Sequence, residues 1–174
     1  MDLTRPYPPE PYLLLPVVPS FDLVSQDISA GQPMDIRHSV DGDNVSPQLS
    51  WSGFPEGTAG FVLSCFDPDA PTPAGFWHWT IVNLPADCTS VPRGFGSADT
   101  ELPAGAVRAR NDGGTLDFTG AAPPPGDHTH RYIFAVHAVD GPVEVPDGIG
   151  CTPAAFMTLF RTIARATLTA TYRR

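Results

Sequence analysis

The stretch Cys65-Phe66-Asp67-Pro68-Asp69-Ala70-Pro71 decides the fold prediction, because an apolar run ends there in two acids and two prolines. Each proline fixes its own φ angle and restricts the residue before it to an extended conformation. Asp67 and Asp69 are therefore expected to be held rigidly where a buried strand ends. Two interpretations follow: a stiffened turn whose carboxylates accept local N–H groups, or one wall of a polar site.

Outward from this stretch, short apolar segments bounded by turn residues recur along the chain. Each has the length of a strand and is rich in aromatic or β-branched residues, which favours antiparallel sheets. In segment 131–139 both alternating sets are largely apolar, so this strand is expected to be covered on both faces. The expected strand segments are 20–25, 48–51, 60–66, 76–84 and 131–139.

A helix is expected near the C-terminus, where Thr152 can act as N-cap and Pro153 suits the first helical position. Apolar residues then recur at helical spacing, and the helix is expected to close one side of a sheet. A pocket wall is the alternative role. The apolar set is Phe156, Phe160, Ile163, Thr167 and Leu168, and the opposite face carries Arg161, Arg165 and Thr169.

Length and composition indicate one β-rich domain. The chain has 174 residues, 41% of them apolar and 17% charged, with 21 prolines and 16 glycines that require many turns. Residues 20–174 are expected to form a single domain, and residues 1–19 a proline-rich extended arm. The apolar run Leu13 to Leu15 is cut by Pro16, so neither a signal peptide nor a membrane span is expected in the arm.

Charge and cysteine usage exclude several functions. Ten basic and 19 acidic residues give a net charge of −9, which repels phosphate backbones and makes nucleic acid an unsuitable partner. The chain has no lysine, so Schiff-base chemistry and a phosphate-loop lysine are excluded. The three cysteines are far apart and form no C-x-x-C motif, which fits a reducing cytoplasm and no zinc-thiolate site.

Two histidines near rigid loops point to a small-ligand site. His78 lies within a dense aromatic strand, and His130 follows the proline-stiffened loop 121–126 at the start of another strand. Imidazoles, backbone N–H groups and a tyrosine hydroxyl at strand ends suit a small anion. The segment 97–130 is also long enough for a functional loop. His137 is expected to be a core imidazole, His38 a loop residue and Cys65 a small buried hydrophobe.

These segments resemble the phosphatidylethanolamine-binding protein family, also called Raf kinase inhibitor proteins, and its bacterial branch in particular. The resemblance covers about residues 20–172 and rests on Asp67 to Pro71, Phe76 to Asn83, Gly120 to Gly126 with His130 to Tyr132, and Asn44 to Trp51. It implies an antiparallel β-sandwich with a C-terminal helix, no cofactor, no obligatory metal, a homodimer, and a cis X-Pro bond at Pro68 or Pro71.

The resemblance also implies a set of site residues, carried over position by position. The pocket would be lined by Asp67, His78, the backbone around Ala122 and Pro123, His130 and Tyr132, with Asp69 and Pro71 shaping it. Asp127 and His128 depart from the family pattern and add a charge and an imidazole to the second loop.

The preferred hypothesis is a non-enzymatic cytoplasmic protein that binds a small anion. The ligand would be phosphate, a phospholipid head group or a carboxylate, and its binding could regulate a protein partner. The alternative is an isomerase, cyclase or hydrolase that uses Asp67, His78 and His130 as general acid and base, although no G-x-S-x-G motif supports a serine nucleophile. A third hypothesis takes these residues and Asp69 as metal ligands.

Overall fold

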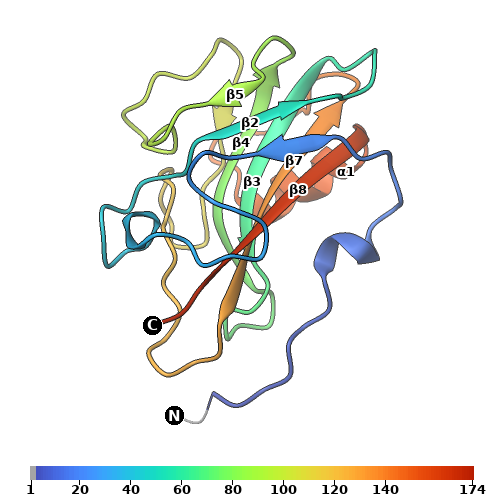
Figure 1. Ribbon diagram of the computed structural model, residues 1–174. Helices are drawn as coiled ribbons and strands as arrows, with labels where there is room; N and C mark the ends of the chain where they lie inside the picture. Colours follow the sequence, from blue (N-terminus) through green and yellow to red (C-terminus); the bar gives the residue numbers. More distant parts are fainter. Residues whose placement is uncertain (1–2) are drawn as a thin grey trace.

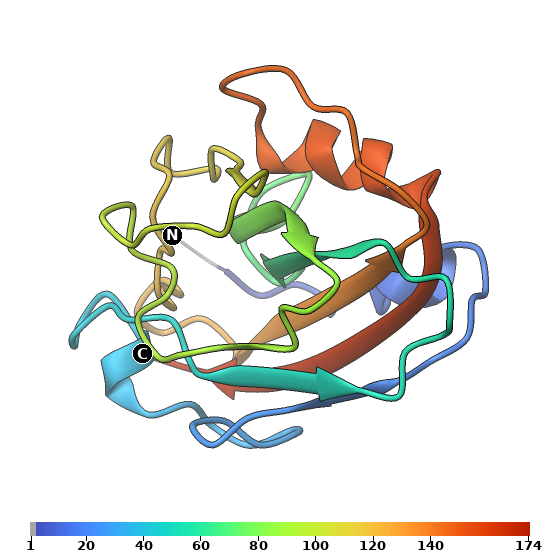
Figure 2. The ribbon, with the colours of Figure 1, turned by 90° about the horizontal axis from the view of Figure 1, so that it is seen from above.

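The computed structural model describes residues 3–174 as two antiparallel sheets packed face to face, with one α-helix on the outside (Figures 1 and 2). The helical elements are η1 (Pro11–Leu14), η2 (Ile36–His38) and α1 (Cys151–Leu159). The strands are β1 (Asp22–Val24), β2 (Leu49–Ser52), β3 (Gly60–Asp67), β4 (Phe76–Pro85), β5 (Ser90–Val91), β6 (Val107–Arg108), β7 (His130–Val139) and β8 (Thr162–Tyr172).

The sheets have the orders β1-β2-β5 and β6-β4-β3-β7-β8, and every strand pair is antiparallel. The main apolar core lies between them and includes Trp51, Leu63 and Phe134. The predicted β-sandwich is therefore confirmed, and each of the five expected strand segments contains a strand. Strands β5, β6 and β8 were not predicted.

The two central strands, β3 and β7, are covered on both faces. Every residue of β7 except Arg131 is buried, as the apolar pattern of 131–139 predicts. Phe134 and Val136 face the main core, whereas Val139 joins a second cluster with Cys151 and Ala154 of α1. The helix thus covers the outer face of the five-stranded sheet, as expected (Figure 2).

The extent of the predicted C-terminal helix is wrong. Helix α1 ends at Leu159, and the residues from Thr162 onward form β8, which pairs with β7 from Val139↔Thr162 to His130↔Tyr172. Threonines and an isoleucine alternate there with Ala164, Ala166 and Ala170, a period of two that lets small residues face the core. Pairing of the whole edge of β7 outweighs the partial helical spacing.

The start of α1 also differs from the prediction. Gly150 is the N-cap, without a side-chain cap hydrogen bond, and Thr152 and Pro153 are the second and third helical residues. Proline is tolerated throughout the first turn because those N–H groups have no partner within the helix. The described residues contain no cis peptide bond, so the cis X-Pro expectation at Pro68 or Pro71 is wrong.

The N-terminal arm lies along the outside of the five-stranded sheet. It contains η1 and is held by Arg165 of β8, whose guanidinium donates to the carbonyls of Tyr12 (3.1 Å) and Pro16 (3.3 Å). The backbone N–H of Arg165 donates to the Pro19 carbonyl. The division of the chain at residue 20 stays a prediction. Among the described residues, no helix has the length and apolarity needed to cross a membrane.

Leu63 provides a test of the core. Its side chain is completely buried between the sheets, so Leu63→Ala is expected to reduce the free energy of unfolding by about 2–5 kcal/mol through lost burial and a residual cavity. Urea denaturation measures the change. Leu13→Ala is the control, because Leu13 is 81% exposed and its loss should change stability by less than about 0.5 kcal/mol. Equal effects of the two variants would contradict this placement of the core.

Candidate functional site

An irregularity in β4 turns His78 toward the inner face of the sheet. Cys65 pairs with Trp79, but Phe66 pairs with Trp77, so His78 is an extra residue between two registered pairs. Trp79 therefore packs in the main core while Trp77 packs on the outer face, although they are two positions apart. Bulges of this kind commonly redirect a side chain beside a functional site. His78 consequently packs against the ring of Tyr132, 5.1 Å between centroids.

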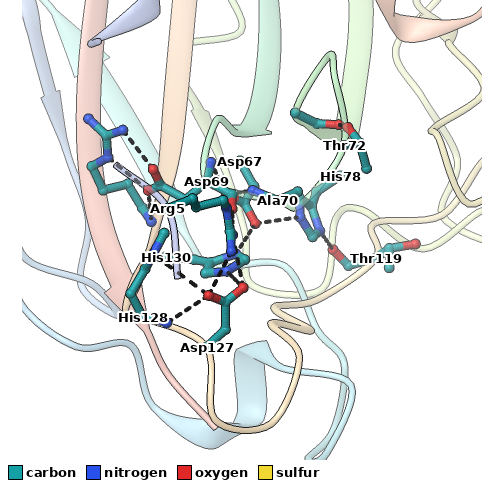
Figure 3. Close-up of polar contacts among 12 residues, drawn as sticks. Arg5, Asp67, Asp69, Ala70, Thr72, His78, Thr119, Asp127, His128 and His130 are labelled. Carbon is teal, nitrogen blue, oxygen red and sulfur yellow. Dashed lines mark hydrogen bonds and ion pairs between the residues drawn. The ribbon is translucent and has the colours of Figure 1, made fainter. Parts of the chain in front are cut away.

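Asp67 is the last residue of β3, and its two carboxylate oxygens have different partners: one binds the turn that follows, and the other faces His130. Oδ1 accepts the backbone N–H groups of Asp69 (2.7 Å) and Ala70 (3.1 Å), which forms the turn that the first interpretation predicts. Oδ2 lies 2.7 Å from Nδ1 of His130, at the start of β7 (Figure 3). Both interpretations of the opening stretch therefore describe part of the geometry.

His130 lies between two carboxylates. Its Nε2 is 3.0 Å from Oδ2 of Asp127, so each ring nitrogen faces an acid (Figure 3). Burial by itself would lower the pKa of His130, but the hydrogen bonds and charges of Asp67 and Asp127 outweigh it and raise the pKa. The doubly protonated imidazolium is the form that satisfies both partners.

The arm completes this row of charges. Arg5 forms a bidentate pair with Asp127, two N–H···O contacts of 2.8 Å, and also donates to the Asp69 carbonyl. Its hydrogen bonds, with those from His130 and the His128 N–H, hold the pKa of Asp127 well below its usual value despite the opposing effect of burial. The result is an Asp67–His130–Asp127–Arg5 chain. We call it the ion chain.

Asp69 belongs to a parallel ion pair and not to the cavity. Arg131 donates to it from the backbone N–H and from Nε, both at 2.8 Å, and from a terminal nitrogen at 2.7 Å. Arg131 also donates to the Pro8 carbonyl. Asp67 and Asp69 thus point to different partners, and no paired-carboxylate site forms.

His78 has one nitrogen without a partner. Its Nδ1 donates to the Thr119 carbonyl at 2.6 Å, since a carbonyl can only accept. Nε2 is buried, has no hydrogen-bond partner among residues 3–174, and lies 4.0 Å from Oδ2 of Asp67. Burial lowers the pKa of His78 although Asp67 opposes the shift. At neutral pH His78 therefore presents an unprotonated, unsatisfied Nε2.

That nitrogen belongs to a residue lining a cavity of about 160 Å³ at one end of the central strands. Five of the residues expected at the pocket from the sequence line it, namely Asp67, Pro71, His78, Ala122 and His130, and their role in binding stays a prediction. Pro123, Asp69 and Tyr132 do not; Tyr132 lies behind His78. The remaining lining residues, which sequence reasoning missed, are Ala70, Thr72, Phe76, Thr119 and Pro124.

Asn111 is a buried residue that orders the long loop before the site, and sequence reasoning missed it. Its Nδ2 is 2.8–2.9 Å from the hydroxyls of Thr115 and Thr119 and the Asp117 carbonyl, and its Oδ1 accepts the Thr115 N–H. The loop thereby presents the Thr119 carbonyl to His78. The sequence offers only an Asn-Asp-Gly-Gly turn signal at this position.

The residues whose geometry could hold a metal ion are not the set proposed from the sequence. Asp127, His128 and His130 each offer one ligand atom, all within 4.8 Å of one another. Both oxygens of Asp127 are already bound by Arg5, and one of them also by His130. A metal ion would have to displace Arg5, so this arrangement does not favour a cation. Asp69, one of the proposed ligands, is bound by Arg131 instead.

The other singled-out residues divide into two outcomes. His38 is not a loop residue, because it ends η2, is completely buried, and bonds through Nδ1 to the Val45 carbonyl at 2.8 Å. His137 is a buried imidazole, and Cys65 is a buried thiol whose pKa is raised by burial, both as predicted.

Two sheets enclosing an apolar core, with a small cavity where the central strands end, define a β-sandwich protein. The particular family follows from comparison. Residues 24–173 match the family model described as phosphatidylethanolamine-binding protein, and the chain belongs to that family.

Similar sequences and solved structures support this family assignment. The chain is 45% identical over 156 residues to the UPF0098 protein YbhB of Escherichia coli K12, a match that covers 86% of this chain and 98% of the relative. The crystal structure of E. coli YbcL, described as a member of the mammalian PEBP family, superposes with a TM-score of 0.84 at 40% identity, over 89% of this chain and 99% of that one. A homologue from Chlamydia trachomatis, CT736, gives a TM-score of 0.77 at 28% identity, over 89% and 98%.

Asn111→Ala is expected to loosen the long loop. It leaves several buried polar groups unsatisfied, so the free energy of unfolding should fall by about 1–3 kcal/mol for each unmatched group. Amide exchange of residues 112–119 should quicken. Urea denaturation and hydrogen exchange measure the two effects. Glu101→Ala is the control, an exposed position in the preceding loop, between β5 and β6; similar behaviour of both variants would contradict the role of Asn111.

The histidines should titrate in a defined order. The raised pKa of His130 places its titration above about 6.5, and the lowered pKa of His78 places its titration below that value. Protonated His130 therefore stabilises the fold fully below about pH 6.5, and this contribution is lost as pH rises through its folded pKa. NMR titration, with His130→Gln to assign the ring, measures the order. A His130 ring that titrates at or below 6.5 would contradict the ion chain.

Proposed function

We propose that the 160 Å³ cavity binds the acidic group of a small molecule, a phosphate or a carboxylate. The unpartnered Nε2 of His78 carries this proposal. A buried polar atom without a partner costs free energy, and a cavity that keeps such an atom is suited to a ligand that supplies the missing hydrogen bond.

The charges around the cavity specify which form of the ligand fits. Asp67 and Asp127 are offset by His130 and Arg5, so the ion chain carries no net charge. Nε2 is unprotonated and needs a proton donor, while Asp67 at 4.0 Å repels a dianion. A phosphate in its monoanionic, proton-carrying form or a carboxylic acid meets both conditions, because it brings the proton that the site lacks.

Within this proposal, the family name supports a phosphorylated head group as the ligand. The cavity is large enough for the acidic group alone, so the remainder of the ligand would extend through its opening. We also propose cytoplasmic location, a homodimer, and regulation of a protein partner through loading of the cavity. The cytoplasmic location rests on the three separate cysteines, and the homodimer and the regulatory role rest on the resemblance to the family.

General acid–base catalysis is the second candidate, favoured by one observation. An unprotonated imidazole nitrogen 4.0 Å from a carboxylate can accept a proton from a substrate. No serine or cysteine lines the cavity, and the Thr72 hydroxyl there donates to the Gly75 carbonyl. Release of p-nitrophenol from p-nitrophenyl phosphate or acetate, abolished by His78→Ala, would favour this candidate.

Direct titration tests the binding proposal. We expect phosphoethanolamine, inorganic phosphate and acetate to shift the His78 and His130 resonances saturably and to leave His38 unchanged. His78→Ala should weaken binding at least about tenfold, the equivalent of one buried hydrogen bond. Affinity should rise as pH falls from 8 to 6. The reason is that the bound complex holds one proton between the acidic group of the ligand and Nε2 of His78, and a lower pH supplies that proton.

His128→Ala is the matched control, since this imidazole neighbours the ion chain but does not line the cavity. It should keep the affinity of the wild type. Unchanged affinity in a folded His78→Ala variant would contradict the proposal. So would wild-type His78 and His130 resonances that no ligand moves.

A further inference from the structure

A second cavity, of about 340 Å³, lies on the opposite face of the same sheet, between β3, β4, the arm and α1. Its walls are mostly apolar, and its volume falls within the roughly 300–1,000 Å³ of small-molecule sites. The residues on which the argument depends are Val62, Phe66, Trp77 and His137 of the sheet, Tyr12 of the arm and Ala155 of the helix. It shares no lining residue with the first cavity.

His137 gives this cavity a defined hydrogen-bond acceptor. Its Nδ1 is 3.1 Å from the Thr162 hydroxyl, and that hydroxyl donates its own proton to the Thr158 carbonyl. The hydroxyl must therefore accept from Nδ1–H, which fixes the tautomer and leaves Nε2 with the lone pair. Nε2 makes no hydrogen bond to the described residues. His137 is 7% exposed, and its Nε2 is not one of the buried atoms that lack a partner, so this nitrogen is open to solvent and to a ligand in the cavity that the residue lines.

The imidazole stays neutral at physiological pH. Burial, and then the positive charge of Arg165 directly across from it on β8, lower the pKa of His137 to about 3. A neutral Nε2 does not attract a carboxylate, but it accepts an O–H or N–H group. The lining also carries the hydroxyls of Tyr12 and Ser64, 3.5 Å apart, and three threonine hydroxyls, of which those of Thr80 and Thr158 donate to the Trp79 and Ala154 carbonyls.

The arm forms one wall of the cavity, through Pro11, Tyr12 and Leu15. Arg165 holds it through the carbonyls of Tyr12 and Pro16 and lies 5.4 Å from the centre of the Tyr12 ring. No carboxylate pairs with Arg165 among residues 3–174, so the guanidinium is committed to the arm. Phe156 at the helical wall is 63% exposed, which leaves the opening apolar.

We propose that this cavity is a second ligand site, for a small neutral molecule with an aromatic or aliphatic body and one O–H or N–H donor. The body would pack against Val62, Phe66 and Trp77, and the donor would bind Nε2 of His137. The site is independent of the anion cavity, because the two lie on opposite faces of the sheet and use different histidines.

A pair of probes that differ in one hydroxyl tests the proposal. p-Cresol and toluene are titrated into the full chain, and binding is followed by NMR of the His137, Trp77 and Tyr12 resonances. We expect p-cresol to bind saturably and at least about tenfold more tightly than toluene. His137→Phe keeps an apolar ring but removes the acceptor, so it should bring the two affinities together. Ala155→Phe should weaken both probes by filling the cavity.

Controls separate this site from the first one. His78→Ala and saturating phosphate should leave p-cresol affinity unchanged, whichever way the anion proposal is decided. The second site is overturned if p-cresol moves none of the three resonances up to its solubility. It is equally overturned if His137→Phe, shown to be folded by its dispersed spectrum, still prefers p-cresol to toluene tenfold, or if Ala155→Phe binds both probes as tightly as the wild type.

Discussion

The ion chain Asp67–His130–Asp127–Arg5 is the constraint on which the rest of the site depends. Three of its groups are almost completely buried, and a buried charge is tolerated only when it is paired and hydrogen-bonded. The ion chain therefore fixes three otherwise separate parts of the protein in one geometry: the end of β3, the start of β7 with the loop before it, and the arm. With Asp67 committed to His130, His78 keeps only its backbone partner, and its second nitrogen remains for a ligand.

The five-stranded sheet presents a comparable imidazole on each face, and the surroundings give the two different chemistry. His78 and His137 both donate from Nδ1 to an internal oxygen, and neither Nε2 makes a hydrogen bond within residues 3–174, although only that of His78 is fully buried. On the inner face a carboxylate lies 4.0 Å from Nε2 and an imidazolium completes the wall, which suits an acid that carries its own proton. On the outer face the walls are apolar and the nearest charge is the cation Arg165, which suits a neutral donor. The irregularity in β4 separates them, because regular alternation would direct His78 to the same face as Thr80.

Local pattern predicted those features that depend on nearby residues. The strand segments follow from β-branched and aromatic runs, and Asp67, His78 and His130 stand out because proline-stiffened loops and dense aromatic residues adjoin them. The rest depends on pairings that are distant in sequence. Strand β8 was mistaken for helix because a period near 3.6 occurs by chance among its residues, whereas the open edge of β7 that selects a strand is a tertiary fact. The partner of Asp127 is 122 residues away, and the role of Asn111 depends on a loop conformation with no periodic signal.

The arm gives this chain features that the family match does not cover. The match begins at residue 24, yet Arg5 holds Asp127 and Tyr12 walls the second cavity. Asp67, His78 and His130 of the 160 Å³ cavity lie within the matched region. The charge balance of that cavity depends on the arm, because without Arg5 the buried Asp127 would face His130 as a second, unmatched carboxylate. The second cavity needs the arm for its wall. Both cavities therefore depend on the arm, which Arg165 anchors on the outer face of the sheet. The same arm carries Arg5, which binds Asp127 in the ion chain.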